Sequence, residues 1–526
     1  MIARAAARTR RLTLAVMLAA AAAVPAIAGA ATAPAPYCAG AVVHGPHGLK
    51  LAATTTARGC RFATGATTSD PGIAVTRNGT VLVAKGSGGV VRSADEGRHW
   101  TDIAVPDLPN GDSHAGGAHG FSYVDARTDR LYYLTSLSGV KSCGGSSGSM
   151  VSWSDDVGAT WHGKTIDCDT YDWGRIVAGP APAGNAYPSA LYFMGVAPRP
   201  VGGTRLVYRS LDGGSTWAKM KNIASATTEA GAGVTAPDGT IYFDYPEFIG
   251  FDPTRVVNGT YPFNPGNLCR EMIAVSQDYG QTWRQEAIPG SLACFSLYGQ
   301  ERVAVDRAGT VYAVWADDVD GRVRMVRSTD KARTWSPAID VMPPGTTYNN
   351  SFVNVIAGAP GHIFIAQQDT DSPVNPRVGI AAGVGTWHTY ISESSDATAP
   401  SPRFTSVDLD PTDDPTYTTG HMPSEAECYV AMTPAGEAWT VFTHGGGATF
   451  GSGSPVDVAH FERPAAAVAS GSTSRPATTP ARHPRTAVVA PARQLAATGS
   501  RTWLPLIAVL ALSAGATLAR RRRASA

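Results

Sequence analysis

The sequence has almost no excess of either charge, because its 526 residues include 43 Lys and Arg against 42 Asp and Glu. Nine of the Arg lie in two terminal segments, four before residue 12 and five from Arg501 onward, and these segments contain no acidic residue. We expect both segments to be removed during maturation, which leaves 34 basic and 42 acidic residues and a net charge of −8. That charge argues against a nucleic-acid partner or an anionic membrane surface.

The sequence also lacks the spacing of common metal sites. It contains no Cys-x-x-Cys pair and no His-Glu-x-x-His motif, and its acidic loops do not follow EF-hand spacing. Three polar stretches remain: Gly111–Gly120 with Asp112, His114 and His119, and the acidic loops Asp317–Gly321 and Asp408–Pro415. We interpret all three as polar surface loops and expect no cofactor. The alternative is a metal site in the first loop and calcium in the two acidic loops, because the preferred ligands of calcium are oxygen atoms.

Long apolar runs occur only at the two ends. The first begins at Leu12, follows four Arg and precedes small residues, which is the order of a secretory signal peptide. We expect cleavage near Ala28 or Ala30 and assign residues 1–30 to this signal. A retained membrane anchor is the alternative.

The second apolar run, Trp503–Ala519, has about the minimum length of 17 residues for a membrane-spanning helix, and Arg520–Arg523 follow it. The peptide LAATG (Leu495–Gly499) precedes it and resembles the L-A-x-T-G sorting signal of high-GC Gram-positive bacteria. By that resemblance, a sortase-type transpeptidase cuts between Thr498 and Gly499 and joins the chain to peptidoglycan. The implied location is the cell wall or cell surface.

The middle of the chain divides into a folded part and a stalk. Residues 464–494 are built mainly from Ala, Pro, Ser, Thr and Arg without a periodic apolar pattern, and such a segment cannot bury a core. We therefore predict a disordered stalk at 464–494, a folded domain at 31–463 and a sorting signal at 495–526.

All seven Cys lie in the folded part, and an oxidising exterior permits disulfides. Their order suggests three local pairs, Cys38–Cys60, Cys143–Cys168 and Cys269–Cys294, with Cys428 left over. Connectivity does not follow from sequence alone, so other pairings remain open.

One octapeptide, in its fullest form Ser-x-Asp-x-Gly-x-Thr-Trp, recurs five times at intervals of 61, 56, 66 and 52 residues. The first copy has His99 in place of Thr, and the fifth has Ala332 in place of Gly. The Ser, Asp and Trp positions are Ser93, Asp95 and Trp100; Ser154, Asp156 and Trp161; Ser210, Asp212 and Trp217; Ser276, Asp278 and Trp283; and Ser328, Asp330 and Trp335.

An apolar hairpin with alternating residues and a Gly-containing turn precedes each octapeptide. The unit is therefore strand, turn, strand, strand, octapeptide, strand, and four antiparallel strands in such a repeat are typical of a propeller blade. Seven hairpins begin at Ile73, Phe121, Arg175, Ala232, Arg302, Val353 and Cys428. We predict an all-β fold, a single propeller with seven blades, with six blades as the alternative.

The last two units are less regular. In the sixth, the stretch Ile380–Tyr390 stands at the expected place of the octapeptide and keeps only Thr386 and Trp387. The seventh has lost the octapeptide. Its last strand is either Val456–Phe461 or a strand from Cys38–Thr56 that closes the ring.

The octapeptide has the chemistry of a turn that stabilises itself. Ser and Asp side chains accept hydrogen bonds from nearby backbone N–H groups, Gly tolerates positive φ, and Trp supplies apolar area between blades. The phrase resembles the Asp-box, or BNR repeat, of sialidases and related propellers, and the resemblance covers about Asp70 to Phe461. It implies that these turns lie on the outer rim, away from any active site.

The same resemblance implies a sialidase site with three Arg, a Tyr nucleophile polarised by a Glu, and an Asp acid/base. The first Arg belongs to a Tyr/Phe-Arg-Ile-Pro motif, but this chain has SDPGIAV (Ser69–Val75) there, and Arg61 is a poor substitute. No motif favours one nucleophile among the possible tyrosines, Tyr123, Tyr245, Tyr298 and Tyr348.

Each innermost strand places its first residues near the mouth of the central channel, where propellers bind ligands. The candidate catalytic residues there are Glu301, Arg302 and Arg175, and the candidate ligand-binding residues are His119, Asp172, Glu229, Glu425 and Glu427. Acidic and Arg side chains that meet at one channel mouth could bind a sugar and cleave it. The alternative is that these side chains form Glu–Arg pairs that only stabilise the channel.

The sequence thus predicts a secreted, wall-anchored, monomeric propeller that binds a glycan or a surface protein at its channel mouth. An exo-acting, sialidase-like glycoside hydrolase is the second hypothesis, and a scaffold without ligand is the third.

Overall fold

The structure is a computed structural model, and it describes residues 35–68, 71–85, 88–115, 120–170, 172–196, 205–223, 231–249, 269–292, 302–317, 319–372, 385–417, 428–433, 435–444 and 454–463. All of these residues lie in one compact unit, Pro34–Ala526. The signal peptide, the stalk and the sorting signal of the sequence prediction fall outside the described residues. Within the described part, no helix has the length and apolar character needed to cross a membrane.

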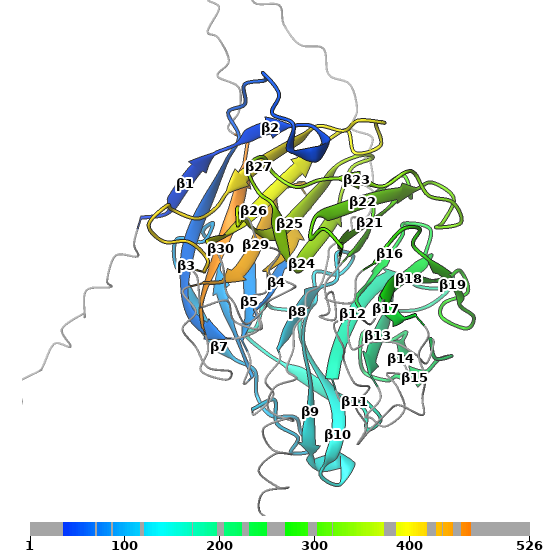
Figure 1. Cartoon of the computed structure of the whole chain (residues 1–526). Helices are drawn as coiled ribbons and strands as arrows, with labels where there is room; N and C mark the ends of the chain where they lie inside the picture. The colour runs from blue at the N-terminus through cyan, green and yellow to red at the C-terminus, as the bar shows by residue number, and fades with distance from the viewer. Residues whose placement is uncertain are drawn as a thin grey trace, which may run out of the picture. The chain divides into compact units, whose positions relative to one another are not determined.

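The described residues form seven antiparallel sheets (Figure 1), which we call blades 1 to 7 and write from the innermost strand outward. Blade 1 is β4 (Gly72–Val75), β5 (Val81–Lys85), β6 (Gly89–Ser93) and β7 (Thr101–Ala104); blade 2 is β8 (Phe121–Val124), β9 (Leu131–Val140), β10 (Ser146–Ser154) and β11 (His162–Asp167); blade 3 is β12 (Asp172–Pro180), β13 (Ser189–Val196), β14 (Arg205–Ser210) and β15 (Ala218–Lys219). Blade 4 is β16 (Gly233–Thr235), β17 (Ile241–Phe248), β18 (Cys269–Ser276) and β19 (Arg284–Ala287); blade 5 is β20 (Val303–Val305), β21 (Val311–Ala316), β22 (Val323–Ser328) and β23 (Ile339–Asp340). Blade 6 is β24 (Tyr348–Ala357), β25 (Ile363–Thr370), β26 (Trp387–Ser394), β27 (Phe404–Asp408) and β2 (Val42–His44); blade 7 is β28 (Cys428–Met432), β29 (Ala438–Thr443), β30 (Ser454–Glu462), β3 (Arg58–Thr68) and β1 (Tyr37–Gly40). The described helices are the short 3₁₀ turns η1 (Pro46–Gly48) and η2 (Lys141–Cys143).

The innermost strands meet in a closed ring. In sequence order β4, β8, β12, β16, β20, β24 and β28 each contact the next, and β28 contacts β4. The predicted all-β propeller with seven four-stranded blades is therefore confirmed, and the six-blade alternative is wrong.

The N-terminal segment closes the ring, but at a position that the sequence analysis missed. The strand β3 pairs antiparallel with β30, which is the third strand of blade 7 (Figure 1). The closing strand is therefore Arg58–Thr68 rather than a strand from Cys38–Thr56. The earlier residues supply two edge strands instead, because β1 extends blade 7 and β2 extends blade 6.

The octapeptide turns, defined as the five copies between Ser93 and Trp335, each join the third and fourth strands of blades 1 to 5. The Ser hydroxyl oxygen accepts a hydrogen bond from the backbone N–H four residues later, at 2.7–2.9 Å in all five copies. The Asp carboxylate accepts from the N–H of the residue before Trp. The residue after Asp has positive φ in every copy, occupied by Glu96, Val157, Gly213, Tyr279 and Lys331.

The tryptophans of these turns pack between blades. Trp100 packs against a cluster from blades 7 and 1, and Trp161 against one from blades 1 and 2. Trp217 packs against a cluster from blades 2 and 3, Trp283 against one from blades 3 and 4, and Trp335 against one from blades 4 and 5. Each Trp therefore joins its own blade to the preceding one by apolar burial, the role that the sequence analysis expected.

A sixth turn of the same kind exists, and the sequence analysis assigned it to the wrong residues. Ser394 donates to Asp396 Oδ1 at 3.1 Å, and Asp396 Oδ1 accepts from the Arg403 N–H at 2.8 Å, between β26 and β27. Trp387, which was placed in this turn, begins β26 at the other end of the strand. The error arose because the N–H that bonds Asp396 belongs to a residue seven positions later, Arg403, whereas in the octapeptide the corresponding residue is four positions after the Asp.

Replacing Ser210 with Ala should lower the free energy of unfolding by about 1–3 kcal/mol, because the buried Gly214 N–H loses its acceptor. The matched control is Ser215→Ala in the same turn, where an exposed hydroxyl donates to the Asp212 carbonyl. We expect a change within about 0.5 kcal/mol for the control. Urea unfolding measures both, and equal effects would show that the Ser hydroxyl is not what holds the turn.

Two of the predicted disulfides are confirmed, Cys38–Cys60 and Cys143–Cys168. Cys269 is also disulfide-bonded, but its predicted partner Cys294 lies outside the described residues. Cys428 is a buried thiol in β28.

Candidate functional site

The structure describes only part of the predicted channel-mouth set. His119, Glu229, Glu301, Glu425 and Glu427 lie outside the described residues, and of Asp172 only the backbone position in β12 is described. The remaining two, Arg175 and Arg302, are both buried. The guanidinium of Arg175 lies over the Phe121 ring, 3.8 Å from its centroid.

Arg302 forms a buried ion pair that sequence reasoning did not predict. Its Nη1 donates to Oε1 of Glu271, and both side chains are only 1% exposed. The prediction joined Arg302 with its neighbour Glu301, but Glu271 comes from β18 of blade 4. No local pattern indicated Glu271, because 31 residues separate the two partners.

Asp244 in β17 adds a second acid to this pair. Asp244 pairs with Ile273 across the strands, and Pro246 pairs with Glu271, so Asp244 and Glu271 are diagonal neighbours on one face of blade 4. Arg302 and Arg205 both act electrostatically on Asp244. We call Arg205, Asp244, Glu271 and Arg302 the buried charge cluster.

The carboxyl group of Asp244 is unusual. Complete burial raises its pKa to about 6, although Arg302 and Arg205 partly offset the effect. Its Oδ1 accepts from the Ala232 N–H at 3.3 Å. Its Oδ2 has no hydrogen-bond partner among the described residues. Asp244 is thus a buried acid with one free oxygen, held near ionisation at mildly acidic pH.

The cluster lies toward the end of the propeller where the innermost strands begin. Arg302 immediately precedes β20, Arg205 begins β14, and Glu271 is near the start of β18. Neighbouring strands of a blade run in opposite directions, so its first and third strands run the same way. Each octapeptide turn follows the end of a third strand. The first and third strands therefore begin at the opposite end of the propeller. The charged residues therefore lie toward the end at which the sequence analysis placed the ligand site.

Two of the candidate tyrosines form hydrogen bonds within the described part of the chain. Tyr245 donates to Gln285 Oε1 at 2.6 Å, and burial raises its pKa. The Tyr123 hydroxyl oxygen accepts from the Ala178 N–H at 2.9 Å. Tyr348 begins β24, and Tyr298 lies outside the described residues. These hydrogen bonds of Tyr245 and Tyr123 are made with an amide side chain and a backbone N–H, and neither is a bond to a Glu carboxylate.

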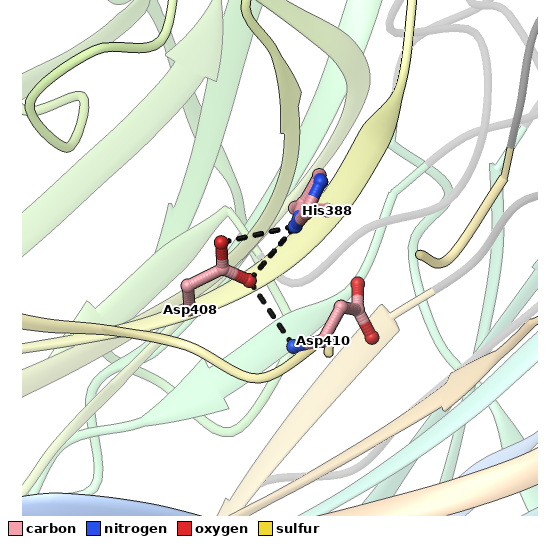
Figure 2. Close-up of side chains that lie close together, drawn as sticks. All are labelled: His388, Asp408 and Asp410. Atoms are coloured by element: carbon pink, nitrogen blue, oxygen red, sulfur yellow. Dashed lines mark hydrogen bonds and ion pairs between the residues drawn. The ribbon is translucent and has the colours of Figure 1, made fainter. Parts of the chain in front are cut away.

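A second titratable cluster joins β26 to the predicted acidic loop Asp408–Pro415. Figure 2 shows His388 from β26 pointing toward Asp408, with His388 Nδ1 2.9 Å from Asp408 Oδ2, and Asp410 beside them. The ligand atoms of these three residues lie within 4.8 Å of one another, which is the spacing of a metal-binding group. The hydrogen bond and charges of Asp408 raise the pKa of His388 despite burial.

Arg61 already neutralises much of this acidic region. Its Nη1 lies 2.7 Å from Asp410 Oδ1, its Nη2 3.0 Å from Asp414 Oδ2, and its Nε 2.5 Å from Asp457 Oδ2. Asp410 also accepts from the Thr389 N–H at 2.7 Å. A guanidinium at the carboxylates disfavours a cation there, so the donor set fits calcium poorly.

The other polar loops of the sequence analysis also have internal partners. Asp112 accepts from the Ser142 N–H at 2.8 Å and from the Thr165 hydroxyl at 2.5 Å. The two ring nitrogens of His114 lie 2.7 and 2.8 Å from the hydroxyl oxygens of Thr135 and Ser152, and burial lowers its pKa to about 4. In the third loop, Asp320 pairs with Arg324.

Two sequence motifs that are known from enzymes occur here, but neither stands between a strand and a helix, where its chemistry requires it. Gly144–Gly148 has the spacing of a nucleophile elbow, and Gly158–Thr165 has that of a phosphate-binding loop. The first leads from η2 into β10, and the second runs from an octapeptide turn into β11. A helix follows neither, so neither has the strand–turn–helix geometry that the chemistry needs.

No family model matches the chain. A xyloglucanase from a Paenibacillus species is 24% identical over 277 residues, which are 48% of this chain and 24% of the relative, so the chain spans about a quarter of that protein. Among solved structures, the Hadza microbial sialidase Hz136 is 16% identical with a TM-score of 0.36, covering 74% of this chain and 64% of that one. An α-L-arabinanase from Penicillium chrysogenum is 12% identical with a TM-score of 0.37, covering 71% and 99%. At these identities the likeness concerns the fold alone.

Proposed function

We propose that the chain is an exported, wall-anchored propeller that binds a glycan at the end where its innermost strands begin. The observation that carries this proposal is the buried charge cluster, with Arg175 toward the same end. Charged groups paired in this way form a rigid base, which holds surrounding side chains in fixed positions for a ligand. The xyloglucanase relative, which covers half of this chain, supports a glycan rather than a surface protein as the ligand.

Export and anchoring rest on the two ends of the sequence. The Arg-led apolar run before Ala30 supports secretion, and LAATG with the following apolar run and Arg520–Arg523 supports attachment to peptidoglycan by a transpeptidase. In this proposal the stalk carries a monomeric propeller clear of the wall. Calcium has no role in it.

A second candidate function, glycoside hydrolysis, is favoured by Asp244. Many glycosidases use one carboxylic acid of raised pKa and one carboxylate kept ionised. Here Asp244 has the raised pKa of about 6, and Arg302 holds Glu271 in an ion pair on the same face of blade 4. In this hypothesis Asp244 donates the proton to the leaving oxygen, and Glu271 is the nucleophile or the base.

The test applies the full chain to a glycan array and to a panel of aryl glycosides that includes sialosides. Saturable retention without turnover supports the binding proposal. Turnover that falls about 100-fold or more in Asp244→Asn, an isosteric change, supports hydrolysis instead. Arg327→Ala, in β22 of blade 5, is the control and should change neither readout. A chain that neither binds nor cleaves any glycan would leave a surface-protein ligand and a scaffold without ligand as the remaining hypotheses.

A further inference from the structure

An open pocket of about 390 Å³ lies beside the outer strands of blade 5, and no residue of the buried charge cluster lines it. Arg322 and Arg324 line it from the start of β22, and Asp340 from β23. The N-terminal turn η1, which contacts β23, adds His47. Its volume falls within the range of about 300–1,000 Å³ that small-molecule sites occupy.

The charges in this pocket are arranged around Asp340. Asp340 is 1% exposed and accepts a hydrogen bond from Nε of Arg322. Nη1 of Arg324 lies 3.7 Å from the same Asp340 oxygen, and Nδ1 of His47 lies 3.6 Å from it. Asp320 pairs with Arg324 on the other side. Two guanidinium groups thus meet two carboxylates, and the pocket carries almost no net charge at neutral pH.

The backbone at the edge of the pocket is held in a strained conformation. His47 has a φ of 60° and a ψ of 26°, the left-handed region that residues with a side chain rarely adopt. Gly48 follows at a φ of 64°, where a Cβ would lie 3.3 Å from the Pro343 carbonyl oxygen. This conformation leaves the His47 side chain 73% exposed beside Asp340.

We propose that this pocket, which we call the rim pocket, binds one unit of a neutral saccharide through its hydroxyl groups. A sugar hydroxyl both donates and accepts, so neighbouring hydroxyls are satisfied by a carboxylate beside a guanidinium, as Asp320 and Arg324 provide. The balanced charge disfavours phosphate and other strong anions, because each Arg is already paired. The same balance disfavours a metal cation.

The inference goes beyond the function proposed above, because the rim pocket shares no residue with the buried charge cluster. A second glycan contact on the same molecule raises avidity for a polysaccharide when both sites are engaged at once. Loss of binding in rim-pocket variants and loss in Arg302 variants are therefore separate results, and either site can fail without the other.

The test is saturation-transfer NMR on the full chain with D-glucose, D-galactose, D-mannose, D-xylose and L-arabinose at millimolar concentration, and with D-glucuronate and inorganic phosphate as anionic probes. We expect at least one neutral sugar to bind. Its affinity should fall about tenfold or more in Arg324→Ala and in Asp320→Asn, because each removes a charge-assisted hydrogen bond. Arg327→Ala, on the same strand but outside the pocket, should leave the affinity unchanged.

His47→Gly separates binding from folding. Gly adopts the left-handed conformation without strain, so this variant should keep its melting temperature while it loses contact with the sugar. Binding of glucuronate or phosphate in preference to the neutral sugars would overturn the proposal. So would the absence of any bound probe, or a neutral sugar whose affinity is unchanged in Arg324→Ala.

Discussion

The Arg302→Met variant should unfold with a free energy about 3–5 kcal/mol lower than that of the native chain. Arg302 and Glu271 are both 1% exposed, so removing one partner leaves a charge in a low-dielectric environment without its ion pair. Glu271→Leu should have a similar cost. Arg302 also lowers the pKa of Asp244, so its loss should raise that pKa further.

The double variant Arg302→Met/Glu271→Leu distinguishes the role of the pair in folding from its role in ligand binding. Replacing both partners of a buried ion pair with apolar side chains is often neutral or stabilising, so the double variant should recover most of the stability lost in either single variant. If the buried charge cluster is the base of the glycan site, the refolded double variant should still fail to bind. Urea unfolding and glycan-array retention measure the two effects.

Additive losses of stability in the double variant would contradict the picture of a mutually compensating pair. Glycan binding that survives in a stable double variant would remove the cluster from the site. Arg327→Ala again serves as the control, because it removes a partly buried Arg of blade 5 outside both sites.

The Asp369→Asn variant should become increasingly more stable than the native chain as the pH rises from about 4 to about 8. Asp369 in β25 is completely buried, and this burial raises its pKa from 3.8 to about 7, although hydrogen bonds from Asn349 and Gln367 partly offset the effect. Between these two values the folded chain keeps a proton that the unfolded chain releases, so stability from this group falls as the pH rises through the window. The full difference corresponds to about 4 kcal/mol.

The amide in Asp369→Asn imitates the protonated acid, so the two proteins should be similarly stable near pH 4. Gln367 favours this exchange, because its Oε1 is buried and has no hydrogen-bond partner among the described residues. A rotated Gln367 amide would present that oxygen to a donor at position 369. Asp371→Asn, an exposed neighbour, is the control and should change the free energy of unfolding by no more than about 0.5 kcal/mol. Thermal unfolding across the pH range measures the difference, and a constant difference would refute the assignment of a raised pKa to Asp369.

Much of the architecture followed from sequence because its causes are local. In each octapeptide turn the Ser and Asp side chains bond backbone groups no more than four residues away. The seven apolar hairpins, five of them followed by an octapeptide, then gave the number of blades. The failure at Ser394–Arg403 has the same origin, because a longer turn with the same contacts no longer matched the repeat.

The candidate site followed less completely. Sequence order placed Arg175 and Arg302 at the beginning of innermost strands, and the structure agrees. It did not predict Glu271 or Asp244, because their relation to Arg302 depends on how blades 4 and 5 pack. The rim pocket was missed for a similar reason, since His47 and Asp340 are nearly three hundred residues apart in the chain.

The sequence by itself determined the repeated four-stranded unit, its hydrogen-bonded turns and the tryptophans between blades. Only the tertiary structure decided which strand closes the ring, which acids pair with Arg61 and Arg302, and where η1 contacts blade 5. The physical reason is the range of the interactions. A turn is stabilised by atoms within one octapeptide, whereas Arg61 meets Asp410 and Asp457 across separations of 349 and 396 residues, which become neighbours only when β3 completes the seventh blade.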